Sequence, residues 1–423
     1  MSRTAEISAD DFCELYAEAV GFFVGGVFMI ASIGIILMSG LILGKLTGKL
    51  KLPPLLGMIA AGMIIGPYCL NLLDEVTLTI SADIRKIALV IILAKAGLTL
   101  NAADLKRVGR PAVLMCFLPA LFEIGGFMLL APKFLGLSLT EAALLGSVIA
   151  AVSPAVVVPR MTKLIEDNCG TDKGIPQLIL AGAAADDVFV IAVFSAVAGL
   201  LGSGDFSAAG IASVPVSVIS GALGGILCGL IFSAFFGKFH FRDTEKIVVF
   251  LAVSFLLTAL ESSLDGIFAF SGLLAVMAMG VTVRVRLPFA ASRMAAKFSK
   301  IWTAAEILLF VLVGAAVNLT YAAKAGAAVI LIIPCALLFR MIGVLCCLIK
   351  TPLNFKERLF CMVAYMPKAT VQAAIGGVPL AMGFGCGETV LTAAVISILL
   401  TAPLGAWGID CLSQKLLKTN QVN

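Results

Sequence analysis

The segment that decides the fold is IPQLILAGAAADDVFVIAVFSAVAGLL, residues 175–201. A helix of this length and apolar character can cross the roughly 30 Å hydrocarbon core of a bilayer. Asp186 and Asp187 begin about eleven residues into it, so at about 1.5 Å per residue they lie roughly 17 Å deep, near mid-membrane. An ionisable side chain at that depth indicates a functional site. The alternative, two acids that are only neutralised by partner bases, stays open.

The same apolar character extends along the chain, which is 61% hydrophobic and 13% charged, with a mean hydropathy of +1.11. A soluble domain would carry charges at about a quarter of its positions. We therefore predict an all-α polytopic membrane protein with about thirteen transmembrane helices, some of the shorter ones tilted or broken. The predicted spans are 21–43, 54–66, 84–100, 112–131, 141–158, 175–201, 207–236, 247–260, 267–283, 304–317, 325–349, 359–382 and 389–411.

Basic residues in the connections and at the ends of the spans fall mainly on one side of the membrane. Of these residues, 22 lie on the side of the C-terminal tail, and the other side has only Arg3, Arg85, Lys86, Lys133 and Lys324. The positive-inside rule makes the richer side cytoplasmic, with the N-terminus outside and the C-terminus inside. Topology thus accounts for the net charge of +5 without a nucleic-acid partner, and the short loops favour a bacterial inner membrane.

Seven charged residues inside the predicted spans are the candidates for a functional role. Lys95 and Glu306 lie near the ends of their spans, where long side chains can reach the interface. The other five are Glu123, Asp186, Asp187, Arg340 and Lys368.

An adjacent pair of buried carboxylates suits the exchange of a cation for a proton. Burial and a second carboxylate both oppose ionisation of a carboxyl group, so it can take up a proton near physiological pH. The deprotonated form offers hard oxygen ligands to a small cation such as Na⁺ or Li⁺. Proton and cation then compete for Asp186 and Asp187, and obligate exchange follows if the carrier reorients only when loaded.

Two predicted spans contain helix-breaking prolines. AVSPAVVVP (151–159) contains Ser153 and Pro154 and ends its span at Pro159, and YMPKATVQAAIGG (365–377) contains Pro367, Lys368 and Thr370. Proline removes a helical hydrogen bond and clashes with the preceding turn. Half-helix termini that face a midplane site are a recurring feature of secondary transporters.

The two breaks occupy equivalent places in two groups of three spans. Glu123 lies one span before the first break and Arg340 one span before the second. Seven spans separate equivalent members, so the groups have opposite orientation and form a predicted inverted repeat. We expect Glu123 and Arg340 to pair, and Lys368 to neutralise a helix carbonyl end or an aspartate. Arg340 and Lys368 could equally be structural counter-ions only.

Three motifs resemble those of the monovalent cation:proton antiporter superfamily, and most closely its aspartate-pair, NHA-type sodium/proton antiporters. They are AVSPAVVVP (151–159), GIPQLILAGAAADD (174–187) and MPKATVQAAIGG (366–377). The resemblance implies that Asp187 is the main ion-binding and proton-carrying residue, with Asp186 as its partner. Arg340 stands where many electrogenic relatives have a lysine. Because arginine keeps its proton, a second proton carrier at this position is in question and the stoichiometry stays open.

The same resemblance implies a homodimer and an elevator-like motion. Residues 1–100 and 247–317 would form the dimerisation domain, residues 112–201 and 325–411 the ion-transporting core, and residues 207–236 a linker helix. The carried ions would be Na⁺ or Li⁺ and H⁺, bound by Asp186 and Asp187, with no resident cofactor.

Other functions are less well matched by the sequence. Potassium/proton exchange stays open, because the motifs do not fix the ion. A sodium-coupled symporter of organic anions should have a more polar and aromatic lining than a chain with four tyrosines and two tryptophans offers. An intramembrane enzyme is not expected, since the single histidine, His240, lies in a predicted loop and an aspartyl protease needs acids on separate helices.

Overall fold

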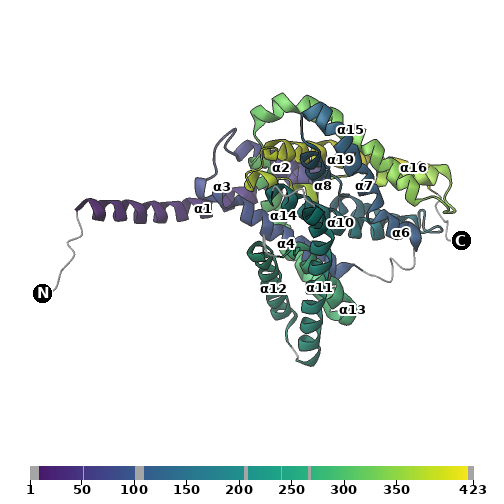
Figure 1. Ribbon diagram of the computed structural model, residues 1–423, viewed down its shortest axis with the longest axis horizontal. Coiled ribbons are helices and arrows are strands. Elements are labelled where there is room, and N and C mark those ends of the chain that lie inside the picture. Colours follow the sequence, from purple (N-terminus) through teal and green to yellow (C-terminus); the bar gives the residue numbers. More distant parts are fainter. Residues whose placement is uncertain are drawn as a thin grey trace.

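A computed structural model describes residues 9–50, 52–100, 109–203, 208–239, 241–264 and 268–417. Arg3 and His240 lie outside the described residues. Within the described segments every regular element is a helix, and α1 runs from one end of the molecule into the bundle formed by the others (Figure 1). The predicted all-helical architecture is confirmed.

Thirteen helices or helix groups coincide with the thirteen predicted spans. The first half contains α1 (Ala9–Lys49), α2 (Pro54–Ile65), α3 (Glu75–Thr79), α4 (Ser81–Thr99), α6 (Arg110–Met115), α7 (Leu118–Leu135), α8 (Leu139–Ile149), α9 (Pro154–Glu166) and α10 (Ile175–Ser203). The second half contains α11 (Ala208–Lys238), α12 (Asp243–Leu264), α13 (Gly272–Arg286), α14 (Pro288–Ala315), α15 (Leu319–Cys347), α16 (Phe355–Ala364), α17 (Thr370–Ile375), α18 (Val378–Ala381) and α19 (Gly387–Leu416).

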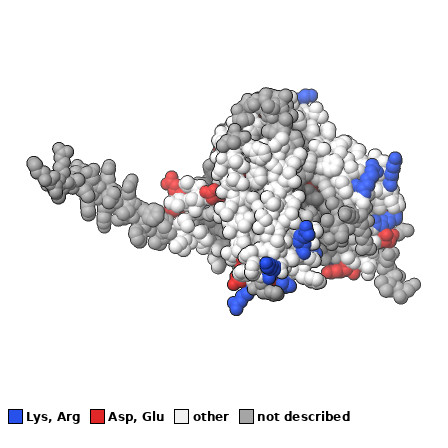
Figure 2. Space-filling model, turned by 60° about the horizontal axis from the view of Figure 1, so that its bottom comes forward, with Lys and Arg blue, Asp and Glu red and all other residues white. Residues whose placement is uncertain are grey.

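Eight helical segments in the described part of the chain are long and apolar enough to cross a membrane. Others, such as α2, are apolar but shorter, so the count of thirteen spans stays a prediction. Figure 2 shows a broad uncharged surface with lysine, arginine, aspartate and glutamate side chains at its margins. This distribution fits a protein surrounded by lipid.

The helices pack in two groups. Helices α1, α2, α4, α12, α13 and α14 contact one another, and α6–α10 contact one another and α15–α19. Helix α11 packs mainly on α13. This close packing uses a stripe of glycines. Gly221 and Gly225 lie against the backbone of Ser271 and Ala275, and Gly229 lies against Met279 and Thr282. Small residues allow membrane helices to approach backbone to backbone.

Both proline-containing spans are broken. The first stops at α8 and resumes with Pro154 as the first residue of α9, where proline's missing N–H is not needed. The second is interrupted between α16 and α17 and again before α18. We predicted that this span ends at Pro159. In the structure α9 continues through Pro159 to Glu166. With α10 and α19 following, the two three-part units match the predicted repeat.

Two details differ from the sequence-based expectation. The helix of the tenth span begins earlier than the predicted span, because α14 starts at Pro288 and buries Met294, Phe298 and Trp302 along one face. Arg85, which we counted with the basic residues of the outer side, is 7% exposed on α4 and its guanidinium lies against Gly377. Its long aliphatic stem and the absence of a side chain at Gly377 make this burial possible.

Lys95 and Glu306, whose long side chains can reach the membrane interface, also lie near each other. Lys95 on α4 and Glu306 on α14 are half-buried and close enough to interact electrostatically. Their helices pack against each other. This pair lies in the helix group that does not contain the broken helices.

Candidate ion site at the crossing of two broken helices

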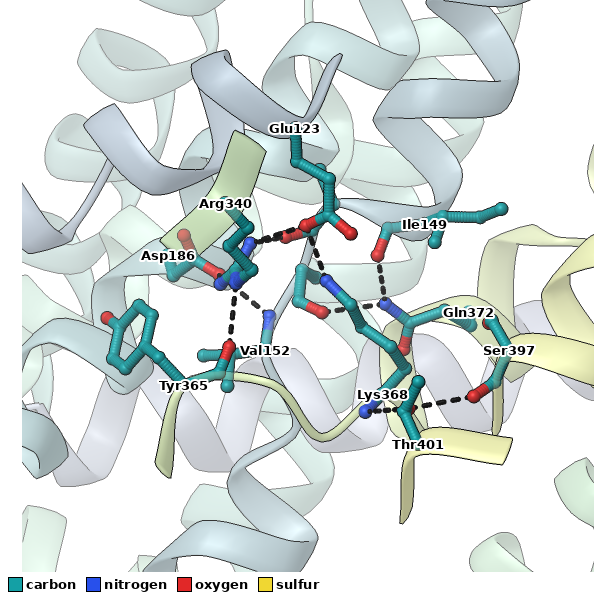
Figure 3. Close-up of polar contacts among 12 residues, drawn as sticks. Glu123, Ile149, Val152, Asp186, Arg340, Tyr365, Lys368, Gln372, Ser397 and Thr401 are labelled. Atoms are coloured by element: carbon teal, nitrogen blue, oxygen red, sulfur yellow. Dashed lines mark hydrogen bonds and ion pairs between the residues drawn. The ribbon is translucent and has the colours of Figure 1, made fainter. Parts of the chain in front are cut away.

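The two breaks touch through their backbones. The N–H of Ser153, just before α9, donates to the carbonyl of Pro367, just before α17, over 2.7 Å. Pro367 thus takes part in the contact and Pro154 directly follows it, and both breaks expose backbone groups that need partners in a membrane interior. The side chains of Ser153 and Thr370 are buried there. This crossing brings together charges from four helices or their ends (Figure 3).

Arg340 is at the centre of the charge cluster. Its Nη1 lies 2.9 Å from Glu123 Oε2 and its Nη2 lies 3.0 Å from Asp186 Oδ2, with all three side chains at most 1% exposed. Helix α7, which carries Glu123, packs along α15, which carries Arg340. The predicted pairing of Glu123 with Arg340 is therefore present.

The same guanidinium also satisfies the backbone of both breaks. Its Nε donates to the carbonyl of Tyr365 over 2.7 Å, and its Nη1 donates to the carbonyl of Ala150. Tyr365 lies at the end of α16 and Ala150 at the end of α8. The planar, forked donor set of arginine allows one side chain to join two half-helices and two carboxylates.

The sequence predicts that Lys368 neutralises an aspartate or a helix carbonyl end, but in the structure Lys368 pairs with Glu123. Its Nζ lies 2.6 Å from Glu123 Oε2, and both side chains are fully buried. Its backbone N–H donates to Thr401 Oγ1 over 2.9 Å, and Thr401 in turn donates to the carbonyl of Ser397. The break before α17 places the ammonium group within reach of α7, which explains the difference.

The adjacent aspartates have different environments. Asp186 Oδ2 accepts from Arg340 and also from the backbone N–H of Val152, over 2.7 Å. Asp187 is 6% exposed and has no hydrogen-bond or ion-pair partner for its side chain among the described residues. Successive helical residues point about 100° apart, so the two carboxylates face different neighbours. Asp186 is fixed in place and Asp187 is available.

Ionic charges in the cluster balance only when Asp187 is left out. Glu123 and Asp186 supply two negative charges, and Arg340 and Lys368 supply two positive charges. An ionised Asp187 adds one uncompensated negative charge in a buried place. Such a charge is expensive unless a cation or a proton joins it.

Several buried oxygens near the crossing have no hydrogen-bond donor among the described residues. They are Asp186 Oδ1, Asp187 Oδ1, Glu123 Oε1 and Ser153 Oγ. Carboxylate and hydroxyl oxygens are hard donors, which suit small hard cations. The donor set thus fits a monovalent cation better than a soft metal ion.

Sequence reasoning missed Gln372 and Thr401. Gln372 Nε2 donates to the carbonyls of Ile149 and Ala151, and its Oε1 accepts from the N–H of Ala369. Both residues are polar positions within apolar spans, and Gln372 follows the break by only a few residues. That signal was present, because an uncharged polar side chain next to a membrane break has exposed backbone groups to satisfy.

A helical membrane bundle with two crossed, broken helices and a buried charge cluster defines a multi-pass membrane transporter. Comparison with known sequences gives the family. The profile of the family described as "Sodium/hydrogen exchanger, transmembrane" matches residues 19–412. The chain belongs to this family of cation/proton antiporters, which are transporters and not enzymes.

Named relatives agree with this assignment. Sodium/hydrogen exchanger 9B2 of Mus musculus is 32% identical over 397 residues, which cover 89% of this chain and 72% of that protein. Sodium/hydrogen exchanger 9B1 of Homo sapiens is 31% identical over 405 residues, covering 90% of this chain and 77% of that protein. The solved sodium proton antiporter MjNhaP1 from Methanocaldococcus jannaschii has the same fold, with a TM-score of 0.81 at 22% identity, over 93% of this chain and 99% of that one.

Proposed function

We propose that this protein exchanges Na⁺ or Li⁺ for H⁺, and that Asp187 binds the cation and the proton alternately. The observation that carries the proposal is the contrast between the two aspartates. Asp186 is fixed by Arg340 and Val152, whereas the buried Asp187 carboxylate has no partner among the described residues. A carrier needs one ligand that is free to lose and regain its ion.

Charge balance supplies a reason for obligate exchange. With either a monovalent cation or a proton on Asp187, the buried cluster is neutral. With neither, it has one net negative charge. Moving a net charge through the hydrocarbon region costs several kcal/mol. The loaded forms therefore reorient and the empty form does not, and this site exchanges one cation for one proton.

We further propose that reorientation is an elevator-like motion. The helix group α6–α10 and α15–α19 would carry the site as a body against the group containing α4 and α14. Support comes from the packing, because all four charges that balance the site lie in one group. A rigid carrier keeps these short ion pairs intact during movement. We also propose that the protein is a homodimer and that it lies in the inner (cytoplasmic) membrane.

The test is exchange in everted membrane vesicles that are acid inside and contain a pH-sensitive dye. Addition of Na⁺ or Li⁺ to wild-type vesicles should dequench the dye, and Asp187→Asn should abolish the response. Asp186→Asn is the matched comparison, since it removes one adjacent charge but keeps the free carboxylate. Because Asp186→Asn leaves the loaded cluster with one net positive charge, we expect much slower cation-dependent dequenching, but not the complete loss expected of Asp187→Asn.

Different outcomes separate the alternatives. Dequenching by K⁺ as strong as that by Na⁺ would favour potassium/proton exchange at the same carboxylate. Full activity of Asp187→Asn would refute the proposed role of Asp187. Failure of Na⁺, Li⁺ and K⁺ to produce any response from correctly inserted wild type would refute cation/proton exchange and favour sodium-coupled symport of an organic anion.

A further inference from the structure

One uncharged side chain connects the two broken helices. Gln372 is fully buried on α17, and its Nε2 lies 2.9 Å from the carbonyl oxygen of Ile149 and 2.8 Å from that of Ala151. Its Oε1 accepts from the backbone N–H of Ala369 over 2.8 Å. In Figure 3 this amide lies between the end of α8 and the start of α17, close to Lys368.

The amide closes the C-terminal end of α8. Three consecutive carbonyls end this half-helix, and all three accept from protein donors. Those of Ile149 and Ala151 accept from Gln372, and that of Ala150 accepts from Arg340. The next backbone group, the N–H of Val152, donates to Asp186. No carbonyl of residues 149–151 is therefore left without a donor.

Such carbonyls are otherwise well suited to bind a cation. The C-terminal end of a helix carries a partial negative charge. In other secondary transporters, unwound carbonyls and half-helix C-termini coordinate Na⁺. Rings of carbonyl oxygens also replace the hydration shell of K⁺ in selective channels. The end of α8 lies one residue from the N–H that holds Asp186, so freed carbonyls would be next to the ion site.

We propose that Gln372 is a specificity-determining residue, which keeps the carbonyls of Ile149 and Ala151 from binding the carried ion. This inference rests on the proposed function. With those carbonyls closed, the ion depends on the side-chain oxygens at the crossing, of which Asp187 Oδ1 and Ser153 Oγ have no donor. A small ligand set favours Na⁺ or Li⁺, and a larger ion such as K⁺ lacks the additional oxygens that it needs.

A neutral amide provides the donors and the acceptor that this position requires. Its NH₂ group has two donors, one for each carbonyl, while its oxygen accepts from Ala369. A lysine or arginine in its place would also cap the carbonyls, but it would add a positive charge to a cluster that is balanced when Asp187 is loaded. Gln372 therefore affects selectivity without changing the charge balance.

The experiment compares Gln372→Met and Gln372→Glu with wild type in the vesicle assay, using Na⁺, Li⁺ and K⁺ separately. Methionine keeps the volume and removes both donors. Glutamate keeps the shape and the acceptor for Ala369, with at most one donor when protonated and none when ionised. Because its ionised form adds a negative charge to the cluster, the ion ratio of this variant is compared with wild type and not its absolute rate. For both, we expect the ratio of Vmax/KM for Na⁺ over K⁺ to fall about tenfold or more, through a gain of K⁺ response.

Thr401→Val is the matched control, since it removes another hydrogen bond of the crossing, that to Lys368, and frees no carbonyl of α8. Its ion ratio should stay as in wild type.

A second readout does not depend on transport. A cation that binds the folded protein raises its melting temperature. Purified Gln372→Met and Gln372→Glu should be stabilised by K⁺ more than wild type is, relative to Na⁺. If Gln372→Met fails to insert, Gln372→Glu decides, because it retains the bond to Ala369.

Three results would overturn the inference. They are an Na⁺/K⁺ ratio within about twofold of wild type in the folded variants, the same shift of ratio in Thr401→Val, or a wild type that exchanges K⁺ as well as Na⁺. Each leaves Asp187-dependent exchange intact. Loss of that exchange in wild type would instead refute the proposed function.

Discussion

At the scale of single residues, the site depends on a difference between two neighbours of the same type. Asp186 and Asp187 have the same chemistry, and the helix points them about 100° apart. One direction contains Arg340 and the N–H of Val152, and the other contains no partner among the described residues. Environment, and not residue type, separates the fixed carboxylate from the available one.

Competition at Asp187 predicts a defined pH dependence of cation affinity. When one proton excludes one cation, the apparent KM for Na⁺ rises about tenfold for each pH unit on the acid side and is constant on the alkaline side. Lower pH therefore weakens apparent Na⁺ affinity and leaves Vmax at saturating Na⁺ unchanged. Initial rates measured across a pH series, with vesicles equilibrated at each value, give the slope.

The slope also counts the protons. Arg340 retains its proton at every pH in this range, so it cannot be a second carrier. A slope of about two orders of magnitude per pH unit would require another titrating group and would contradict one-for-one exchange. A KM independent of pH would contradict competition altogether.

At the scale of helices, the breaks are stabilised by partners that lie far away in sequence. The carbonyls at the end of α8 accept hydrogen bonds from side chains on α15 and α17. The backbone just before α17 donates a hydrogen bond to Thr401 on α19. In a membrane interior these groups have no water to replace such partners. The two broken helices therefore support each other, and neither break would be stable alone.

Close backbone packing of α11 on α13 gives a prediction about stability. A side chain at Gly225 would overlap the carbonyl and Cα of Ala275, so Gly225→Leu should force the two helices apart. We expect a loss of about 1–3 kcal/mol, as is typical of overpacking. Thermal unfolding of purified protein in detergent measures the change.

Gly237→Ala on the same helix is the control for this substitution. Its added methyl group would make only an ordinary contact with Leu287, at 3.9 Å. Its melting temperature should equal or exceed that of wild type, since alanine favours a helix more than glycine does. Equal stability of Gly225→Leu and wild type would show that α11 and α13 do not pack this closely.

At the scale of the whole molecule, the charged margins give a testable orientation. The loop with Cys69 and the first turn of α16, with Lys356, lie toward opposite ends of the molecule, beside α3 and α16 in Figure 1. Both residues are exposed. From the positive-inside rule we predict that the α16 end lies in the cytoplasm.

Labelling with a membrane-impermeant thiol reagent checks this orientation. A variant that retains Cys69 as its only cysteine should react in intact cells. A cysteine-free variant with Lys356→Cys should react in everted vesicles and not in intact cells. The reverse pattern would invert the predicted topology, and labelling of both from one side would contradict the odd number of spans predicted between these two positions.

Much of this architecture follows from the sequence, because transfer from water to hydrocarbon is a local property. The length of each apolar run decides by itself whether that run can cross the membrane, and each proline breaks its own helix. The membrane class, the two breaks and the intramembrane charges at Glu123, Asp186, Asp187, Arg340 and Lys368 could therefore be predicted. The start of α14 could not, since its first turns are stabilised by tertiary burial of residues such as Phe298.

Apart from the pair of Glu123 and Arg340, which the predicted repeat indicated, only the tertiary structure decided how these residues are paired. Glu123 and Arg340 are 217 positions apart, and the Gln372 contacts span more than 220. Ion pairing and capping depend on distances of about 3 Å between atoms, which hydropathy along the chain does not specify. The sequence by itself determined that charges must lie in the membrane. Folding decided that Lys368 neutralises Glu123, that Arg85 is buried against Gly377, and that Asp187 is the carboxylate left without a partner among the described residues, because these depend on the rotation and crossing of helices around one another.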